Sequence, residues 1–525
     1  MALYLGLDSS TQGLTATLIE IDGDRRAVVL TRALRFDEEL PRYGTRHGVL
    51  PSADPTIVHA PPLMWAEAME RMLAALARED LNWGSLRAIS GSGQQHGSVY
   101  LTAQATVRLD ALASDRPLVD QLGDVLSRPT SPIWMDSSTS AQCAAIEAAL
   151  GGPAAVAALT GSRAFERFTG PQIRKFAEQE PDAYARTDRI HLVSSWMASL
   201  LAGRHAPIDH GDGSGMNLMD LAQRQWAPAA LAATAPGLAS KLPPLASPWT
   251  VAGPLAPFWT RRFNLPAARI VAWSGDNPCS MVGTGLIREG MVAISLGTSD
   301  TIFGPMSSAK PSQDGTGHVF ASTIGNYMGM TVFKNGSLAR ERVRDEHGLT
   351  WTGFADALRR SAAGNGGSLM LPWFEPEITP LVLKPGARRF DLDPKDPAAN
   401  VRAVVEAQMM AMARHSRWMN VEIQTIYATG GAATNRDILQ VMADVFNADV
   451  YQFATPNSAA LGAALRAYHA DQLADGRDVG WSEVVSGFAE PIAASRVSPI
   501  AANAERYCAL AETYGQHERD ALAGA

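Results

Sequence analysis

The chain contains two apolar segments that are each interrupted by a short polar stretch. The first is LYLGLDSSTQGLTATLIEID at residues 3–22, and the second is GMVAISLGTSDTIFG at residues 290–304. In both, strand-like runs flank a tip of Gly, Ser, Thr and Asp, a pattern that predicts a β-hairpin. Two polar-tipped hairpins favour two domains of related architecture, although two short matches do not establish a duplication.

The length of the chain supports this division. At 525 residues it exceeds the roughly 250–300 residues at which a single core stops growing. Helix-like segments at 63–79 and 138–150 alternate with short β-branched runs such as 269–276, which indicates an α/β fold. We expect the run at 269–276 to join the first sheet. The boundary is therefore placed just before the second hairpin, giving domains 1–287 and 288–525.

Composition limits the classes of partner. Apolar residues make up 46% and charged residues 19%, as is typical of soluble globular proteins. Cys143, Cys279 and Cys508 lie far apart without zinc-site spacing, which predicts a reducing compartment and a cytoplasmic protein. No segment has the ~20 apolar residues that span a bilayer, and a net charge of −8 does not attract nucleic acid. We expect small-molecule partners, no membrane and no nucleic acid; the oligomeric state stays open, with a homodimer among the alternatives.

The usual phosphate-binding motifs are missing from the sequence. Gly-Lys does not occur, which excludes a Walker-type loop, and no GxGxxG lies at a strand-to-helix turn. Another way to hold phosphates uses two hairpin tips that present backbone N–H groups, hydroxyls and a metal-bound carboxylate. The tips at 8–13 and 297–301 supply these groups.

A third element suggests where a nucleoside would bind. Residues 425–453 form an apolar run that ends in Gly430 and Gly431, followed by an amphipathic helix that starts near Asn435. Paired glycines let a flat ligand lie on the backbone, and a helix N-terminus offers donors. Alone, a strand-to-helix turn with glycines for packing is the better interpretation; together with the two tips, the pattern favours an adenosine site.

Nine short motifs in order along nearly the whole chain carry a resemblance to a known family. The sequence resembles the FGGY sugar kinases of the actin/hexokinase/Hsp70 superfamily, and is most similar to the xylulose kinases among them. Many bacterial relatives have a methionine before the histidine of this motif. The sequence here, GQQHG, has glutamine at that position and is in this respect similar to the eukaryotic branch. The motifs are GLDSSTQG (6–13), SGSGQQHGSVY (90–100), WMDSSTSAQC (134–143), TGSRAFERFTG (160–170), HGDGSGMN (210–217), SGDNP (274–278), SLGTSDT (295–301), FKNGSLARE (333–341) and ATGGAATNRDILQ (428–440).

The resemblance implies two ribonuclease-H-like domains that flank a catalytic cleft, with the ketose on the first and ATP mainly on the second. It implies ATP-dependent phosphorylation of D-xylulose to D-xylulose 5-phosphate. Such a transfer needs a base for the hydroxyl proton, and Asp276 is our candidate; the alternative is a turn-forming Asp before Asn-Pro. Gln95, a neutral His96, Arg167 and Asn277 are expected to bind the sugar, although a lone histidine is more often a satisfied buried group.

Asp8 is, in family terms, the carboxylate that organises Mg²⁺, largely through water. The alternative is an Asp that closes its own turn. Asp300 is either a second metal-side carboxylate or a turn residue, and we favour the turn. The residues expected to contact ATP are Thr11, Gln12, Gly13, Gly297, Thr298, Ser299, Trp351, Gly430, Gly431 and Asn435.

Two departures from the family pattern concern the first tip. Ser9-Ser10-Thr11 stands where relatives commonly carry Gly-Thr, and Thr15 stands where they tend to have Lys or Arg. Either Mg²⁺ supplies the missing positive charge, or another basic residue such as Lys334 does. Two further functions stay open: the same reaction on another polyol or sugar acid, and a nucleotide-binding sensor that phosphorylates nothing. Asp276 argues against the sensor, because a binding module needs no base.

Overall fold

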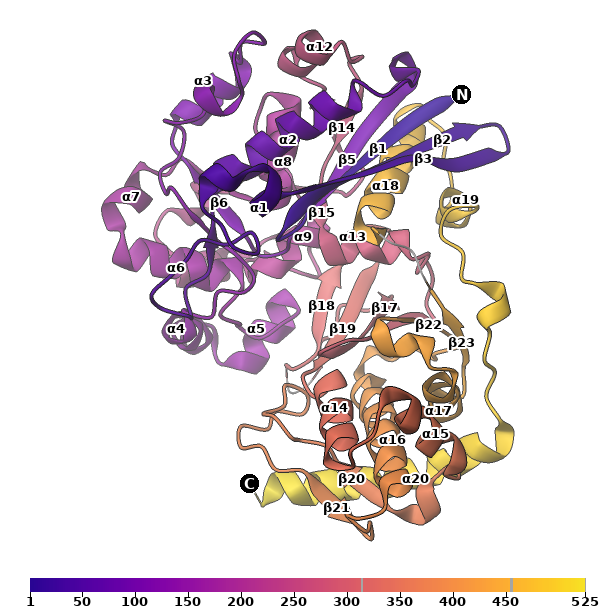
Figure 1. Ribbon diagram of the computed structural model, residues 1–525. Helices are drawn as coiled ribbons and strands as arrows, with labels where there is room; N and C mark the ends of the chain where they lie inside the picture. The colour runs from indigo at the N-terminus through magenta and orange to yellow at the C-terminus, as the bar shows by residue number, and fades with distance from the viewer. Residues whose placement is uncertain (313–314, 454–456, 525) are drawn as a thin grey trace. The chain divides into compact units, whose positions relative to one another are not determined.

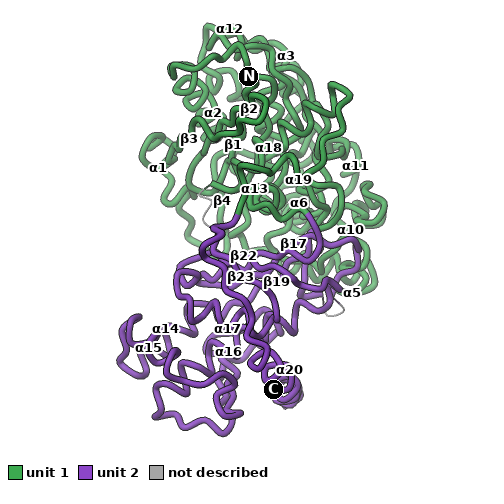
Figure 2. The backbone as a smooth tube through the Cα atoms, turned by 90° about the vertical axis from the view of Figure 1, so that its right-hand side faces the viewer, with its two compact units in different colours: residues 1–287, 320–327, 455–490 green, residues 288–319, 328–454, 491–525 purple. Residues whose placement is uncertain are grey.

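The computed structural model describes residues 1–312, 315–453 and 457–524, which divide into two compact units (Figures 1 and 2). Unit 1 comprises Met1–Ile287, Phe320–Tyr327 and Thr455–Glu490, and unit 2 comprises Arg288–Val319, Met328–Ala454 and Pro491–Ala525. The chain first passes between units at the position of the predicted boundary. The prediction differs for 320–327 and 457–490, which it placed in the second domain and which this division assigns to unit 1, although residues 318–321 form a strand of the sheet described below for unit 2.

Unit 1 is built around a seven-stranded mixed sheet. The strand order is β13-β14-β5-β1-β2-β3, with β15 paired to β5. The predicted hairpin forms β1 and β2, and β14 and β15 join this sheet as expected. The bounds are β1 Ala2–Ser9, β2 Gly13–Asp22, β3 Arg25–Arg35, β5 Leu86–Gly93, β13 Val251–Pro254, β14 Arg269–Val271 and β15 Ser274–Gly275.

Side chains that alternate along β1 face two different layers of helices. Leu3, Leu5 and Leu7 belong to the apolar core that also contains residues of α2 (Pro62–Leu76) and α8 (Val193–Ala202). On the other face, α18 (Ser458–Ala474) lies along β1 and β5. The Tyr4 hydroxyl donates to Asp471 of this helix at 3.0 Å. This packing explains why a segment so late in the chain belongs to unit 1.

Unit 2 contains a six-stranded mixed sheet in the order β18-β19-β17-β16-β22-β23. The second predicted hairpin forms β16 and β17, and the strand before Gly430 forms β22, which pairs with β16 in parallel. The bounds are β16 Met291–Leu296, β17 Asp300–Met306, β18 His318–Ala321, β19 Tyr327–Phe333, β22 Thr425–Thr429 and β23 Asp449–Gln452.

Helices of unit 2 pack on one another around an apolar core formed with its sheet. The central helix α16 contacts α14, α15, α17 and α20. The helix expected after Asn435 is α17. The bounds are α14 Ser337–Glu346, α15 Trp351–Arg360, α16 Pro397–His415, α17 Arg436–Phe446 and α20 Ala501–Ala523.

A helix that crosses a membrane must be both long and apolar. Among the described residues, no single helix meets both requirements. The adjacent helices α4 (Ser140–Leu150) and α5 (Pro153–Thr160) do so only when taken together, and they are bent by 82°.

Candidate active site

Asp8 lies in β1 rather than in the turn that follows it. It pairs with Thr15 of β2 and with Ser92 of β5, and the Ser92 hydroxyl donates to its Oδ1 at 2.7 Å. The turn is closed by Ser10, whose backbone N–H and hydroxyl both donate to the carbonyl of Gly13, at 3.0 and 3.1 Å. The turn-closing interpretation of Asp8 is therefore not supported.

The sheet brings Asp8 and Asp276 to the same edge. β1 runs parallel to β5, and β15 also runs parallel to β5. Asp8 is the penultimate residue of β1, and Asp276 directly follows β15, where it begins α13 (Asp276–Gly283). The carboxyl ends of parallel strands form the edge at which ligands usually bind in open α/β sheets.

The electrostatics of these two carboxyl groups are coupled. Burial raises the pKa of Asp8 to about 6, and the Ser92 hydrogen bond opposes this rise only in part. Burial, followed by the charge of Asp8, raises the pKa of Asp276 to about 7. No ion pair among the described residues includes either carboxylate. Asp276 therefore has a pKa near neutrality, as suits a general base.

Amide side chains surround Asp276. Its Oδ1 accepts from the backbone N–H of Asn277 at 2.8 Å and from Asn277 Nδ2 at 3.2 Å. The same Nδ2 donates to Gln95 Oε1 at 2.8 Å, which leaves Gln95 Nε2 as a buried donor without a protein partner. The predicted sugar-binding residues Gln95 and Asn277 thus lie together beside the predicted base, with a donor that a substrate oxygen would satisfy.

His96 is buried and held in one tautomer. Its Nδ1 lies 2.8 Å from the carbonyl oxygen of Gly215, which can only accept, so Nδ1 carries the proton and Nε2 is an acceptor. Burial and the nearby Arg167 charge lower the pKa of His96 to about 3, so the ring is neutral as expected. Its φ of 72° is unusual for a residue other than glycine, and such backbone strain is concentrated at functional sites.

The two arginines of the motif at 160–170 differ in their surroundings. Arg167 lies over the rings of Phe165 and Phe168, 4.9 and 5.3 Å from their centroids. Phe168 stacks on His96 at 4.4 Å, which connects Arg167 to the site. Arg163 instead forms an ion pair with Glu147 at 3.6 Å.

The residues of the first tip have different environments. Thr11 Oγ1 accepts from Trp134 Nε1 at 2.9 Å, and Gln12 is exposed. Gly13 lies so close to β3 that a Cβ would stand 2.3 Å from the Leu34 carbonyl oxygen, so packing alone requires glycine there. Their contact with phosphate stays a prediction.

Unit 2 contains a cavity of about 1150 Å³ at the second tip. It is larger than the ~300–1,000 Å³ usual for small-molecule pockets. Of the residues expected to contact the nucleotide, Gly297, Thr298, Trp351, Gly431 and Asn435 line it, whereas Ser299 and Gly430 do not. Asn435 caps α17, its side chain accepting from the N–H groups of Asp437 and Ile438 at 2.9 and 3.2 Å.

Trp351 offers an aromatic face in this cavity. It begins α15, and its side chain is 48% exposed. The Arg344 guanidinium lies 4.5 Å from the ring centroid, and Phe354 contacts the ring edge-on at 5.6 Å. An exposed indole held by its neighbours is suited to stacking on a flat heterocycle.

The basic side chains that line the described part of this cavity are arginines, and they do not include the lysine suggested by the sequence. Arg340, Arg359 and Arg436 line the cavity, and Lys334 is not among its lining residues in the described part of the chain. Asp300 pairs with Arg340 through both carboxylate oxygens. Asp300 is thus engaged by a cationic side chain, in contrast to Asp8.

The carboxylates at the sheet edge of unit 1 fit a divalent cation with few protein ligands. The described residues contain no group of three or more His, Cys, Asp or Glu side chains able to hold a metal. Asp8 and Asp276 are two hard oxygen donors close enough to interact and without a paired cation. Mg²⁺ commonly binds through one or two carboxylates and keeps several waters. Asp8 would hold such an ion here.

Comparison with known proteins decides the family. Residues 3–283 match the N-terminal domain, and residues 292–470 the C-terminal domain, of the FGGY family of carbohydrate kinases. The chain belongs to the FGGY family. This FGGY kinase is 41% identical to the xylulose kinase of Rattus norvegicus over 533 aligned residues, which cover 99% of this chain and 97% of the rat protein. The resemblance to the family, including its eukaryotic members, is confirmed.

Solved structures confirm the fold. The ligand-bound xylulose kinase of Lactobacillus acidophilus superimposes on this FGGY kinase with a TM-score of 0.81 at 18% identity, covering 100% of this chain and 99% of that one. The gluconate kinase of the same organism gives a TM-score of 0.81, 18% identity and the same coverage. Kinases named for different sugars thus share the fold equally, so the fold does not determine the substrate.

Two functional features of this FGGY kinase were missed from its sequence. Ser92, which donates to Asp8, lies within a quoted motif, and only the parallel pairing of β1 with β5 identifies it as a partner. Arg340 also lies within a motif, but its pairing with Asp300 follows from the packing of α14 against the second tip.

Proposed function

We propose that this chain catalyses the ATP-dependent phosphorylation of D-xylulose to D-xylulose 5-phosphate. The full-length similarity to a rat protein named xylulose kinase supports the substrate. The observation that carries the reaction is the partly buried Asp276, which has a pKa of about 7, lies beside Gln95 and Asn277, and interacts with the carboxylate of Asp8.

Asp276 would act as the general base. Its carboxylate would accept the proton of the attacking sugar hydroxyl as that oxygen bonds to the γ-phosphorus of ATP and the bond from this phosphorus to ADP breaks. Such a role is worth on the order of 10²–10⁴-fold in rate. The Asn277 backbone N–H holds Oδ1 in place at 2.8 Å. The remaining carboxylate oxygen is then the one that takes the proton.

The neighbouring polar groups would orient the ketose. Gln95 Nε2 donates to a sugar oxygen, and Nε2 of the neutral His96 accepts from a sugar hydroxyl. Arg167, held against two phenylalanine rings, adds further donors. Donors and acceptors in fixed positions align one hydroxyl with the base and reduce the entropy cost of reaction.

The nucleotide would bind in the cavity of unit 2, with Gly297 and Thr298 at its phosphates and Trp351 against its base. Asp8 would hold Mg²⁺ in unit 1. Bound together, ATP and Mg²⁺ supply the transferable phosphoryl group and neutralise the negative charge on its oxygens.

The substrate is tested by a panel of sugars. ADP release coupled to NADH oxidation is measured with D-xylulose, D-ribulose, L-ribulose, L-xylulose, gluconate and glycerol. The proposal expects the highest kcat/KM with D-xylulose. A higher value with another compound would replace the substrate and keep the chemistry, whereas sugar-independent nucleotide binding without turnover would favour the sensor.

We also propose a cytoplasmic location. Cys143 and Cys279 are buried free thiols and Cys508 is an exposed one, which suits a reducing compartment. Microscopy of a tagged full-length chain tests the location. Sedimentation tests the alternative of a homodimer.

A further inference from the structure

A buried ion pair lies directly behind the second hairpin tip. Asp300 begins β17 and Arg340 lies in the first turn of α14, and their side chains are 2% and 1% exposed. Arg340 Nη1 donates to Asp300 Oδ2 at 2.8 Å, and Nη2 donates to Oδ1 at 3.0 Å. This bidentate geometry fixes both side chains in orientation as well as in distance.

The ion pair is connected to the tip backbone. Arg340 Nη2 also donates to the carbonyl oxygen of Gly297 at 3.4 Å. The backbone N–H of Ser337 donates to the same oxygen at 2.8 Å. Two positions of α14 therefore hold the first residue of the tip, and Gly297 and Thr298 are the tip residues that line the cavity.

The turn before α14 touches the tip from the same side. A Cβ on Gly336 would lie 2.7 Å from Asp300 Oδ1 and 2.7 Å from the Thr298 carbonyl oxygen, distances that leave no room for a side chain. The turn and the tip are thus in direct backbone contact, and a displacement of one would move the other.

Gln408 of α16 bridges the ion pair and this turn. Its Oε1 accepts from Arg340 Nη1 at 2.9 Å, while its Nε2 donates to the carbonyl oxygens of Asn335 and Gly336 at 2.7 and 2.8 Å. Each polar atom of the Gln408 amide is therefore used to hold a segment that packs on the tip.

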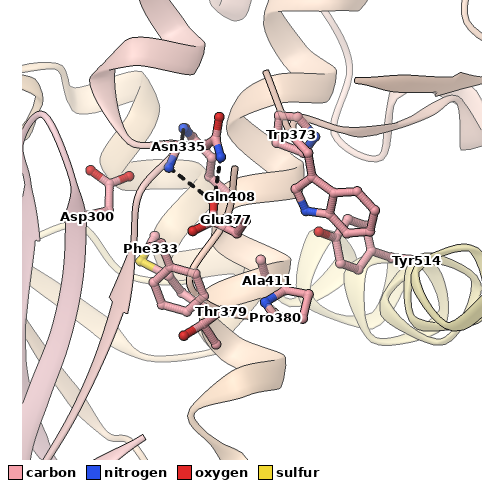
Figure 3. Close-up of a pocket in the computed structure, with 12 residues that line it drawn as sticks. Asp300, Phe333, Asn335, Trp373, Glu377, Thr379, Pro380, Gln408, Ala411 and Tyr514 are labelled. Atoms are coloured by element: carbon pink, nitrogen blue, oxygen red, sulfur yellow. Dashed lines mark hydrogen bonds between the residues drawn. The ribbon is translucent and has the colours of Figure 1, made fainter. Parts of the chain in front are cut away.

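The space behind the cluster leaves little room for a ligand of its own. The cavity lined by Asp300, Asn335, Glu377 and Gln408 has a volume of about 20 Å³ (Figure 3). That volume accommodates about one water molecule. Glu377 accepts from the backbone N–H groups of Lys334 and Asn335, at 2.6 and 3.1 Å, and is engaged in holding the turn. The cluster therefore supports the tip rather than a second site.

We propose that Arg340, Asp300 and Gln408 form a positioning cluster that sets the conformation of residues 297–299 for binding of the nucleotide phosphates. Arg340 acts through the backbone of the tip and is a positioning residue. This inference rests on the proposed function, since it assigns the tip to the nucleotide of that reaction. A buried ion pair is itself weak evidence for stability, because neutral replacements of both partners are often tolerated. The hydrogen bond from Arg340 of this ion pair to the carbonyl oxygen of Gly297 in the tip indicates a positioning role.

The test separates stability from positioning with two variants. Arg340→Gln leaves Asp300 buried without its cation, so we expect a lower Tm together with a higher KM for ATP. The double variant Asp300→Asn/Arg340→Gln removes both charges, and its Tm should recover toward that of the wild type. Its KM for ATP should stay raised by about tenfold or more, because small misplacements of binding groups are costly, while the KM for the sugar changes less than ~2-fold.

Matched measurements make the outcome decisive. Arg414→Gln breaks the α16–α20 contact of Arg414 with Glu518 at 2.9 Å, and should lower Tm without changing the KM for ATP. If the double variant does not fold, Gln408→Met is used, which keeps both charges and removes the bridge; it too should raise the KM for ATP. Wild-type KM values for ATP in the double variant, or in Gln408→Met, would overturn the inference.

Failure of the proposed function would be recognised separately. If the wild-type chain turns over no sugar, binding of ATP is measured by calorimetry in the same variants. Weaker ATP binding in the double variant or in Gln408→Met, with wild-type binding in Arg414→Gln, supports the positioning cluster even then. Equal affinity in all of them overturns it.

Discussion

The two hairpin tips have the same strand arrangement but opposite electrostatics. In unit 1, β1 pairs with β2 antiparallel and with β5 parallel, and in unit 2, β16 pairs with β17 antiparallel and with β22 parallel. Asp8 at the first tip accepts one hydroxyl hydrogen bond. Asp300 at the second tip is neutralised by a bidentate arginine.

The two carboxylates, that of Asp300 buried and that of Asp8 partly buried, are used in different ways. Burial raises the pKa of both Asp8 and Asp300, but only Asp300 has a cationic partner. An ionised group without a partner is costly to bury, and such costs persist mainly where function requires them. We therefore assign the carboxylate of Asp8 to reaction chemistry and that of Asp300 to shaping the second tip.

The largest effect is expected at Asp276, the carboxylate that the charge of Asp8 influences. Asp276→Asn keeps the shape of the side chain but cannot take up the proton, so kcat should fall on the order of 10²–10⁴-fold. D-xylulose should still bind, because Gln95, His96 and Arg167 remain. Steady-state kinetics and sugar binding by calorimetry are the measurements. A variant that keeps more than about a tenth of wild-type turnover would show that Asp276 only orients the sugar.

Asp8→Ala should give the next largest loss. Removing a ligand of a charge-stabilising cation should lower kcat by about 10²-fold or more, since such an ion is worth several kcal/mol. Sugar affinity should be nearly unchanged, because cation binding and sugar binding involve different residues. Asp8→Asn should keep part of the activity only if water mediates the metal contact. An equal loss of sugar affinity in both variants would instead make Asp8 structural.

Replacement of Asp by Asn at the first tip and at the second tip should change the free energy of unfolding of the protein in opposite directions. Asp300→Asn leaves the Arg340 charge unpaired and should cost about 3–5 kcal/mol. Asp8→Asn removes an unpaired, partly buried charge and should stabilise by about 0.5–2 kcal/mol at pH 8. Chemical denaturation of both variants measures this. Destabilisation of similar size in both would remove the electrostatic distinction between the tips.

The gain from Asp8→Asn should depend on pH with a definite sign. The pKa of Asp8 is raised from 3.8 to about 6 in the folded chain, so the folded state binds more protons than the unfolded state between these values. The cost of the ionised carboxylate is then fully present above pH 6 and lost as the pH falls toward 3.8. The stability difference between Asp8→Asn and wild type should shrink accordingly from pH 8 to pH 4.

The smallest effect concerns the pH profile of kcat/KM. Because Asp276 must be ionised to act as a base and its pKa is about 7, activity should decrease on the acid side of neutrality. The charge of Asp8 contributes to that raised pKa, so the acid limb of Asp8→Asn should move to lower pH. An acid limb unchanged in position would indicate that the two carboxylates do not interact.

Much of the fold was predictable from local sequence patterns. The alternation of apolar residues on either side of Ser10 and of Thr298 identified both hairpins, and the apolar period after Asn435 identified α17. These signals are local, because a few consecutive residues are enough to show the periodicity of a strand or a helix. Ordered motifs then associated the hairpin tips with a family.

Long-range partners were not predictable in this way. No local pattern indicates that Arg340 would pair with Asp300 instead of contacting phosphate, or that α18 would cover β1. Both depend on how distant elements pack, and a single sequence contains no record of that. For the same reason the sequence did not show which basic residues lie at the cavity. Lys334 was suggested to supply the positive charge that is missing at Thr15, whereas Arg340, Arg359 and Arg436 are the basic residues that line the described cavity.

The position of α18 has a consequence for how the chain is made. Unit 1 begins with β1, yet the helix that covers one face of β1 spans Ser458–Ala474 and is synthesised only after most of unit 2. A ribosome adds about 5–20 residues per second. The helix that covers this face of the first sheet is therefore synthesised some tens of seconds after β1. A chain truncated before Ser458 would lack α18, and this face of the sheet would stay uncovered. The first unit to be started is therefore among the last to be completed, and one face of its sheet lacks its helix during that interval.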